Sequence, residues 1–433
     1  MSRVPNVTSV PQEIAEAIVL PGGYGDLEGV VFPACDWLRA NAPIAQVEVE
    51  GHDRVWLISK HQHNKEILRD AATFLSEPNN HFLTTTAGDD YLRSILGGTT
   101  KVIDNLTPMD GEDHRGHRAA QAEAFSIEAI RKYEPRFREL ATKSVDRFLA
   151  AGGECDAVAT LAQNFPLEVV MEMISVPESD FALMHKMTQE TFGGDDPDIV
   201  SESDADMSPE TLARLWQESA QYFYDYFEDM RVERLRCPID DLSSAIVNGR
   251  MPDGELMSPL RQNHMLSSIA LAGHDTVSSA IAGGIHGLAT HPDQLALARQ
   301  DPSLIPGLVD EALRWSIPAK HFMRTAGRDV DFHGQQIKAG DRIMCLFVSA
   351  NRDEDVFPDP YRFDITRKPN PQLSFSFGPH ICLGLHVTKI EMKALYAELV
   401  SRITSLELAG EPRLKLGNFV TGLKTLPVRY TPA

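Results

Sequence analysis

The longest run of apolar residues at helical spacing lies between Pro259 and His291. Ser258 suits the N-cap position and Pro259 suits the first helical position, so the pattern predicts a helix of about 30 residues. A helix this long and this apolar is expected to cross the core of the protein. Polar side chains within the run exclude a membrane span: His264, His274, Asp275 and His286.

A second apolar pattern with helical spacing follows a cysteine near the C-terminus: Leu383, Val387, Ile390, Ala394 and Ala397. Further helices are predicted over residues 61–69, over most of 126–248 including 210–236, and over 308–315. Alternating residues and turn signals predict strands at 47–49, 54–59, 330–333 and 342–347, and a terminal hairpin within 412–429. The predicted fold class is therefore mainly α with smaller β regions.

Three segments lack such patterns. Residues 1–25 end at Pro21-Gly22-Gly23, and we expect them to form a loosely docked N-terminal arm. Residues 77–109 are polar and predict a long, weakly structured connection, which in a compact enzyme is usually a lid or a substrate contact. Residues 193–208 are acidic and are expected to be mobile.

The charge balance and the cysteines narrow the possible functions. With 62 acidic and 41 basic residues, the formal net charge is −21, which argues against nucleic acid and anionic membranes as partners. Five cysteines without paired spacing indicate a reduced, intracellular protein. The N-terminal residues show no signal-peptide layout, so the expected localisation is cytoplasmic.

Cys382 is the strongest candidate for chemistry. It lies in the loop Phe375-Ser376-Phe377-Gly378-Pro379-His380-Ile381-Cys382-Leu383-Gly384, directly before a predicted helix. The unpaired N–H groups and the positive dipole end of that helix favour a thiolate, which is a soft metal ligand. Gly378 and Gly384 leave room for a flat, bulky group beside the backbone. The residue alone leaves open an ordinary buried cysteine.

The long predicted helix contains Ala272-Gly273-His274-Asp275-Thr276. Small residues at 272 and 273 permit the close approach of a ligand, and Thr276 can bond to a preceding carbonyl and bend the helix. An aspartate in a core-crossing helix is costly unless it is paired or functional. The sequence alone therefore leaves two alternatives for Asp275, a paired buried charge or a functional residue.

Two further motifs are short and have plain alternatives. His114 and Arg118 lie four residues apart on one face of a predicted helix, as in many solvated helix starts. Glu311 and Arg314 lie three residues apart, and taken alone they match an ordinary surface salt bridge.

Together, in this order and spacing, these motifs resemble the cytochrome P-450 superfamily of haem-thiolate monooxygenases. Phe-x-x-Gly-x-x-x-Cys-x-Gly resembles its haem-binding loop, and Ala272 to Thr276 resemble its oxygen-activation motif. The resemblance implies one P-450 domain over residues 1–433, shaped as a triangular prism. It also implies haem b between the long central helix and the helix after the Cys loop.

The resemblance assigns roles to individual residues. Cys382 would be the iron ligand, with Phe375 and Gly384 beside the haem. Asp275 would gate proton entry and Thr276 would form a hydrogen bond near the iron, although Val277 departs from the second hydroxyl residue that is common in the family. The haem propionates would contact a set of basic side chains: His114, Arg118, Arg324 and His380. A buried structural network without a chemical role would comprise Glu311, Arg314 and Arg362.

Within the superfamily, residues 273–276, 309–315, 322–325 and 349–353 resemble the bacterial terpineol-hydroxylating members. This implies a small hydrophobic substrate, either a monoterpenoid such as terpineol or an alkyl-substituted aromatic or cyclic hydrocarbon. Larger lipids, such as steroids or fatty acids, are the alternative. By family position, the pocket would be lined by Ser268, Ile269, Ala272, Ile317, Ala319 and Val420.

The implied partners are O2 and a [2Fe–2S] ferredoxin with its reductase. A basic docking face would comprise Arg115, Arg118, Lys389 and Lys393, with a scatter of solvated charges as an equal alternative. A peroxide-driven haem-thiolate enzyme usually replaces the acid–alcohol pair, so Asp275-Thr276 disfavours it. A haem-bound sensor or carrier would not need that pair. A cysteine hydrolase is not supported, because no adjacent motif supplies a base or an oxyanion hole.

Overall fold

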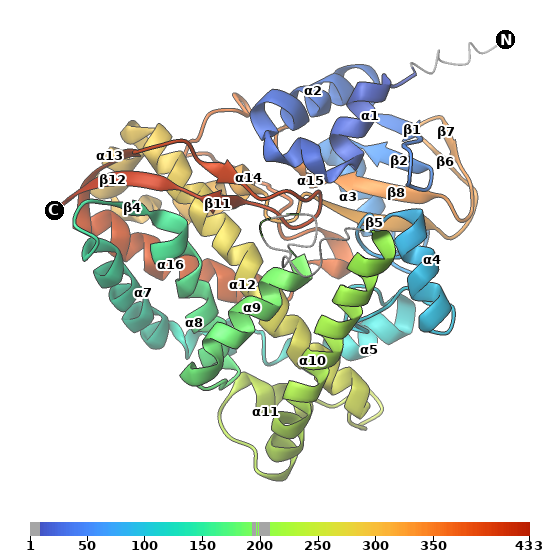
Figure 1. The fold of residues 1–433 in the computed structure, drawn as a ribbon, viewed down its shortest axis with the longest axis horizontal. Helices are drawn as coiled ribbons and strands as arrows, with labels where there is room; N and C mark the ends of the chain where they lie inside the picture. Colours follow the sequence, from blue (N-terminus) through green and yellow to red (C-terminus); the bar gives the residue numbers. More distant parts are fainter. Residues whose placement is uncertain (1–8, 193–195, 197, 199–207) are drawn as a thin grey trace.

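The computed structural model describes residues 9–192, 196, 198 and 208–433 of the chain. These residues are mainly helical with small sheets, and the outline in Figure 1 is roughly triangular, with α11 (Leu242–Val247) at its lower apex. The predicted fold class is confirmed. The prediction of a mobile acidic segment at 193–208 falls almost entirely outside the described residues. Within the described part of the chain, no helix combines the length and apolar character needed to cross a membrane.

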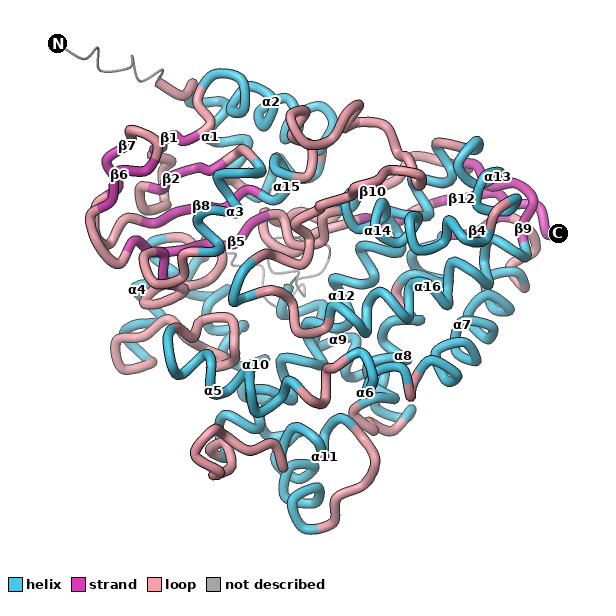
Figure 2. The backbone as a smooth tube through the Cα atoms, turned by 180° about the vertical axis from the view of Figure 1, so that it is seen from behind, coloured by secondary structure: helices cyan, strands magenta, loops and turns pink. Residues whose placement is uncertain are grey.

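The predicted long helix is α12 (Pro259–Thr290), which crosses the middle of the molecule in both views (Figures 1 and 2). Ser258 caps it by accepting a hydrogen bond from the N–H of Arg261. Its second half packs closely against α14 (Ile305–Ser316) and α16 (Leu385–Arg402). A Cβ on Gly284 would collide with Tyr396 and Ala312, so this close packing requires glycine.

The other helices of the α-rich part surround α12. The long α7 (Glu134–Leu149) packs along α16, while α8 (Asn164–Met173) and α10 (Pro209–Arg236) contact α12 itself. In the described residues of 126–248, the predicted predominance of helix is confirmed, with a short strand, β4 (Glu154–Asp156), inside the range. The remaining helices here are α5 (Gly111–Ala122), α6 (Ile127–Arg131), α9 (Phe181–Phe192) and α13 (Pro292–Gln300).

The β-rich part is a five-stranded sheet in the order β1-β2-β8-β5-β3. Its strands are β1 (Ile44–Val47), β2 (Val55–Ile58), β3 (Phe74–Leu75), β5 (His321–Ala326) and β8 (Arg342–Leu346). β1 and β2 form the predicted hairpin, and β2 pairs with β8 in parallel. The helices that lie beside this sheet in Figure 2 are α1 (Gln12–Val19), α2 (Phe32–Asn41), α3 (His61–Arg69) and α15 (Phe347–Ala350).

Smaller sheets lie outside this unit. β6 (Val330–Phe332) and β7 (Gln335–Ile337) form one hairpin, and β10 (Arg413–Leu414) and β11 (Leu423–Thr425) form the predicted terminal hairpin. The chain then continues into β12 (Pro427–Pro432), which joins β4 and β9 (Ile403–Leu408). Val420, in the connection between β10 and β11, forms an isolated antiparallel β-bridge with Ala319.

The prediction of a loosely docked N-terminal arm is wrong for residues 9–25. α1 and the short 3-10 helix η1 (Pro21–Gly25) bury Ile18 and Tyr24 in the core beside the five-stranded sheet. The hydroxyl of Tyr24 donates to the carbonyl oxygen of Ile18 at 3.0 Å. A helix of 8 residues repeats its apolar pattern too few times to stand out against the Pro-Gly-Gly that follows.

The connection 77–109 is also more regular than predicted. It contains α4 (Thr86–Ile95), whose first turn is capped by the Thr85 hydroxyl accepting from Gly88 N. The cap is a local signal that the polar composition of the segment obscured.

Candidate active site

Two adjoining cavities lie beside the middle of α12. The first, here called the cysteine cavity, measures about 300 Å³ and is lined by Cys382 and residues of α5, α12, β5 and α16. The second, the aromatic cavity, measures about 370 Å³ and includes Phe82, Trp216 and Phe419 in its wall. The residues that line both cavities mark their junction: Asn105, Thr107, Ser268, Ala272, Thr276, Ala319 and Phe322.

The loop before α16 holds Cys382 on the wall of the cysteine cavity. The N–H of Cys382 donates to the carbonyl oxygen of Phe375 at 2.8 Å, and Phe375 and Gly384 line the same cavity. Gly378 has φ +74°, and a Cβ there would collide with the carbonyl of Leu68 in α3. Packing against α3, and not space for a ligand, therefore explains the glycine at 378.

Opposing effects set the pKa of Cys382. Burial raises the pKa and is the largest effect, while the N–H groups of Gly384 and Leu385 and the guanidinium of Arg118 lower it. The start of α16 thus acts on the sulfur in the predicted direction. Burial opposes this effect and is the larger of the two, so the helix end alone does not bring the pKa of Cys382 below its ordinary value. A metal cation at the sulfur would supply the missing stabilisation.

The structure brings together the basic side chains that the sequence assigned to propionate binding: His114, Arg118, Arg324 and His380 line the cysteine cavity. The rings of His114 and His380 lie 4.1 Å apart between centroids. Within the described part of the chain, neither arginine forms an ion pair with a carboxylate, and Nε2 of His114 has no hydrogen-bond partner. Burial lowers the pKa of both arginines, and burial followed by Arg324 lowers the pKa of His380 to about 2.

Thr276 and Asp275 leave α12 on different faces. Thr276 lines both cavities, and its Oγ1 donates to the carbonyl oxygen of Ala272 at 2.7 Å. Asp275 is buried, with Oδ1 3.7 Å from Nζ of Lys415 and 3.9 Å from Nδ1 of His274. Among the described residues, Asp275 is outside the lining of either cavity. Its burial is compensated by pairing, as the cost of a buried charge requires.

The residues predicted to line the substrate pocket are placed as follows. Ser268, Ala272 and Ala319 line both cavities, Ile269 lines the cysteine cavity and Val420 lines the aromatic cavity. Ile317 lines neither cavity in the described structure, because it ends α14 with φ +46° and its side chain packs in the core beside the sheet.

Lys320 explains why Ala319 and Val420 lie together. It is fully buried, and its Nζ donates to the carbonyl oxygens of Ser316, Ile317 and Thr421 at 2.9, 2.6 and 3.0 Å. Burial lowers the pKa of Lys320 to about 7, whereas three carbonyl acceptors favour its charged form. The ammonium thus ties the end of α14 to the tip of the β10–β11 hairpin.

The aromatic wall was not predicted from the sequence. Phe82 and Phe419 stack with centroids 5.0 Å apart, Trp216 meets Phe82 edge-on at 5.3 Å, and Phe322 meets Phe419 edge-on at 5.3 Å. His81 stacks on Phe322, and burial lowers its pKa to about 3, so its ring is neutral. These residues come from separate segments in which single aromatic residues form no periodic pattern.

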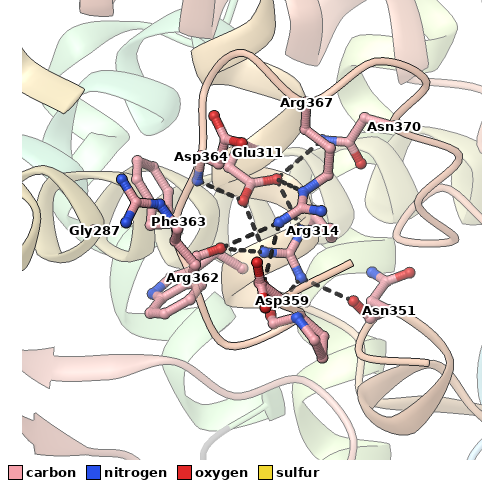
Figure 3. Close-up of polar contacts among 12 residues, drawn as sticks. Gly287, Glu311, Arg314, Asn351, Asp359, Arg362, Phe363, Asp364, Arg367 and Asn370 are labelled. Atoms are coloured by element: carbon pink, nitrogen blue, oxygen red, sulfur yellow. Dashed lines mark hydrogen bonds and ion pairs between the residues drawn. The ribbon is translucent and has the colours of Figure 1, made fainter. Parts of the chain in front are cut away.

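A second polar cluster lies in the core below α14. Arg314 donates from Nε and Nη2 to the two carboxylate oxygens of Glu311 at 2.8 and 2.7 Å, and both side chains are fully buried (Figure 3). Arg314 also donates to the carbonyl oxygens of Asn351, Pro360 and Arg362. The pair is therefore a buried network and not the surface salt bridge that the spacing alone allowed.

The prediction that the Arg362 side chain completes this network is wrong. Its Nη2 pairs with Asp293 at 2.9 Å, and both side chains are exposed. Arg367 takes the expected place, with Nε 3.5 Å from Oε2 of Glu311. Because Phe363 is buried against α12 at Gly287, the adjacent Arg362 turns its side chain outward and contributes only its carbonyl oxygen.

The four residues predicted to form a docking face lie in two different environments. Arg118 lines the cysteine cavity and is only partly exposed. Arg115 pairs with Glu112 at 3.4 Å and Lys389 with Asp310 at 2.7 Å, while Lys393 is exposed on α16. Three of the four predicted cations therefore remain at the surface.

Comparison with known proteins agrees with this arrangement. The family model for cytochrome P450 matches residues 39–430. Cytochrome P450-terp of Pseudomonas sp. is 44% identical over 425 residues, covering 98% of this chain and 99% of that protein. A steroid C26-monooxygenase of Mycolicibacterium smegmatis is 29% identical and covers 96% of each chain. The crystal structure of CYP108D1 from Novosphingobium aromaticivorans has a TM-score of 0.90 at 37% identity, covering 99% of this chain and 100% of that one.

Haem b, the cofactor of this family, fits the cysteine cavity. Cys382 offers one soft sulfur donor, and two guanidiniums without carboxylate partners among the described residues, Arg324 buried and Arg118 half-buried, suit two propionates. Nε2 of His114 offers a further hydrogen bond. Since this donor set, the fold and the match over residues 39–430 all agree, the chain belongs to the cytochrome P450 family and is a cytochrome P450 monooxygenase.

Proposed function

We propose that this monooxygenase hydroxylates a small hydrophobic compound, either a monoterpenoid such as terpineol or an alkyl-substituted ring hydrocarbon. Electrons would come from a [2Fe–2S] ferredoxin and its reductase. The observation that carries the proposal is the 44% identity with cytochrome P450-terp over 98% of the chain. Larger lipids are the second candidate, because a steroid C26-monooxygenase and a methyl-branched lipid omega-hydroxylase are relatives at 29% identity.

The size of the aromatic cavity supports the smaller substrate. With haem in the cysteine cavity, the substrate would occupy the aromatic cavity of about 370 Å³. That volume is near the lower end of the range for ligand pockets, roughly 300–1,000 Å³. The flat faces of Phe82, Trp216 and Phe419 suit a ring or a branched hydrocarbon.

The proposed roles in haem binding follow from the cysteine cavity. Cys382 would hold the iron, and haem bound in this way supplies the oxygen activation that hydroxylation of an unactivated C–H bond requires. Arg118 and Arg324 would each bind a propionate, with the neutral imidazoles of His114 and His380 as further hydrogen-bond donors.

The proposed proton path uses two neighbouring residues. The hydroxyl of Thr276 donates a hydrogen bond to the carbonyl oxygen of Ala272. Its Oγ1 therefore has lone pairs that would accept a hydrogen bond from the cavity side. Asp275 would collect protons on the opposite side of this turn, where Lys415 pairs with its carboxylate. Thr276→Ala is expected to divert electrons from product to hydrogen peroxide, and Asp275→Asn to slow turnover while substrate binding is kept.

The electron donor would approach the surface that carries Arg115, Lys389 and Lys393. Charge reversal at Lys389 and Lys393 is expected to slow reduction by ferredoxin and to weaken its salt dependence. Unchanged rates at every ionic strength would remove this surface from the proposal.

Spectral titration of the purified holoenzyme tests the substrate class. Terpenes and alkylbenzenes are expected to shift the haem spin state at lower concentration than steroids or fatty acids, and the reverse order would replace the proposed class.

Turnover is expected with ferredoxin and O2, whereas equal turnover with peroxide alone would favour a peroxide-driven enzyme. Cys382→Ala is expected to abolish the red-shifted Soret band of the reduced CO adduct. If this variant kept the band, a different residue would be the iron ligand.

A further inference from the structure

A hydrogen-bonded polar pair lies at the junction of the two cavities, and so far one of its members, Ser268, has only been expected to line the pocket. The Nδ2 of Asn105 donates to Oγ of Ser268 at 2.5 Å. Asn105 comes from the loop before α5 and Ser268 from the first half of α12, and both line both cavities. In ligand pockets that are otherwise apolar, a few fixed polar groups set the orientation of the ligand.

A second contact fixes the orientation of the Asn105 amide. Its Oδ1 accepts a hydrogen bond from the N–H of Thr107 at 2.9 Å, so the NH2 group is the one that faces Ser268. An amide nitrogen carries two N–H donors, and only one is used by Ser268. Among the described residues, no acceptor takes the second donor.

Ser268 also has a proton to donate. Ser267 and Thr276, on the same helix, each donate to the carbonyl oxygen four residues earlier. Ser268 instead accepts from Asn105, and within the described part of the chain its O–H donates to no acceptor. The pair thus presents one N–H and one O–H donor at a place where both cavities meet.

The position of the pair relative to Thr276 gives the site a direction. Ser268, Ala272 and Thr276 follow one another at four-residue spacing along α12, and all three line the junction. Ser268 lies two helical turns from Thr276, about 12 Å along the axis. A compound held by an oxygen at Ser268 and lying along this face of α12 would have its opposite end toward Thr276.

We propose that Asn105 and Ser268 form an anchor for one hydrogen-bond-accepting oxygen of the substrate, a hydroxyl or carbonyl oxygen on an otherwise hydrocarbon ring. The inference rests on the proposed function, because it specifies which small hydrophobic compounds the enzyme prefers. The anchor selects oxygenated terpenoids over the matching hydrocarbons and directs oxidation to the end of the molecule remote from the oxygen.

Ser268→Ala tests the anchor, with Ser267→Ala as the matched control. Ser267 is buried, donates to Asn263 at 2.9 Å and is outside the described lining of both cavities. The probes are α-terpineol and p-menth-1-ene, which differ only by the hydroxyl group. In spin-state titrations of the holoenzyme, Ser268→Ala is expected to raise the dissociation constant for α-terpineol about tenfold and that for p-menth-1-ene less than twofold. Ser267→Ala is expected to change the ratio of the two constants less than twofold.

Product analysis gives a second measurement on the same variants. Ser268→Ala is expected to lower the fraction of α-terpineol oxidised at the end remote from its hydroxyl. Asn105→Asp keeps an acceptor for the Thr107 N–H but removes the amide donors, so it is expected to cause the same selective loss. This second variant tests the anchor independently if Ser268→Ala does not yield folded holoenzyme.

The outcomes separate the anchor from the proposed function. Equal weakening of both probes would show that the pair only clamps the loop to α12, and it would overturn the anchor while the proposed function stands. An unchanged constant for α-terpineol in both variants would overturn it equally. If neither probe shifts the spin state of the wild-type enzyme, the proposed function fails and the anchor fails with it.

Discussion

The arginines in two regions of this protein differ in how many of their hydrogen-bond donors the chain itself satisfies. In the core below α14, each of the five N–H donors of Arg314 has an acceptor in the chain (Figure 3). In the cysteine cavity, Arg324 is buried and Arg118 is half-buried, yet neither pairs with a carboxylate of the described residues. The chain completes its own network around Arg314, whereas the cavity arginines keep donors that the proposed propionate contacts would use.

Substitutions in the two regions are expected to change different properties, stability in one and haem retention in the other. Damage to the Arg314 network is expected to lower the free energy of unfolding, because a buried charge is left without its partner. Damage to the cavity arginines is expected to weaken haem retention and to leave the fold intact.

The largest effect is expected for Glu311→Leu. It leaves Arg314 buried without its carboxylate and also removes acceptors from Asn370 and from the N–H of Asp364. The free energy of unfolding, measured by urea titration of the holoenzyme, is expected to fall by about 3–5 kcal/mol. Glu218→Leu is the control, since Glu218 pairs with Arg214 at 2.8 Å on the exposed face of α10. A loss below about 1 kcal/mol for Glu311→Leu would contradict the contrast.

The next effect concerns the cavity side of the comparison. Arg324→Met is expected to speed haem transfer to apomyoglobin roughly 10–100-fold, because a charge-assisted hydrogen bond contributes about 1.5–3 kcal/mol. Urea unfolding of the polypeptide is expected to change little, since the side chain has no ion pair with the described part of the protein to lose. Unaltered haem transfer combined with a large loss of stability would place Arg324 with the structural arginines.

Local signals explain what could be predicted from the sequence. The Ser258-Pro259 start and the sustained apolar spacing define α12, and the glycine-bounded loop before α16 defines the place of Cys382. The basic cluster around the cysteine is assigned in a different way, from the resemblance of its residues to family positions, because no local pattern links His114 and Arg118 in α5 with Arg324 in β5 and His380.

Features that depend on the path of the chain could not be predicted. Arg367 and not Arg362 faces Glu311 because Phe363 is buried and turns the adjacent Arg362 outward. No local pattern reveals this. The aromatic wall joins Phe82, Trp216 and Phe419 from segments far apart in the sequence. Such contacts follow from tertiary packing, which periodicity does not encode.

Glu391 extends the comparison to an acidic group, because its buried carboxyl group lines the cysteine cavity. It lies in α16, its Oε2 has no hydrogen-bond partner among the described residues, and burial raises its pKa well above the ordinary value. The folded state therefore keeps a proton that the unfolded chain loses. Stability is expected to fall as pH rises above the ordinary carboxyl pKa toward the folded one, by up to about 1.4 kcal/mol per pH unit.

Glu391→Gln is expected to remove this fall, so that the variant is more stable than the wild type at pH 8 and similar at pH 4. Urea titrations across this range measure it. Glu398→Gln, on the same helix and paired with Arg402 at 3.2 Å, is the control and is expected to keep the wild-type slope. If Glu391→Gln kept the wild-type dependence of stability on pH, Glu391 would belong with the buried groups that the chain itself satisfies, such as Glu311.

The smallest effect is expected for Arg362→Ala, which tests the boundary of the structural network. The exposed pair of Arg362 with Asp293 is expected to contribute at most about 0.5 kcal/mol and to weaken further at high salt. Arg367→Ala removes the cation that does face Glu311, so it is expected to cost more and to be less sensitive to salt. Urea unfolding of both variants at low and high salt decides the matter. If Arg362→Ala were the more destabilising of the two, the outward direction of its side chain would be wrong, and the network would have the membership that the sequence motif first indicated.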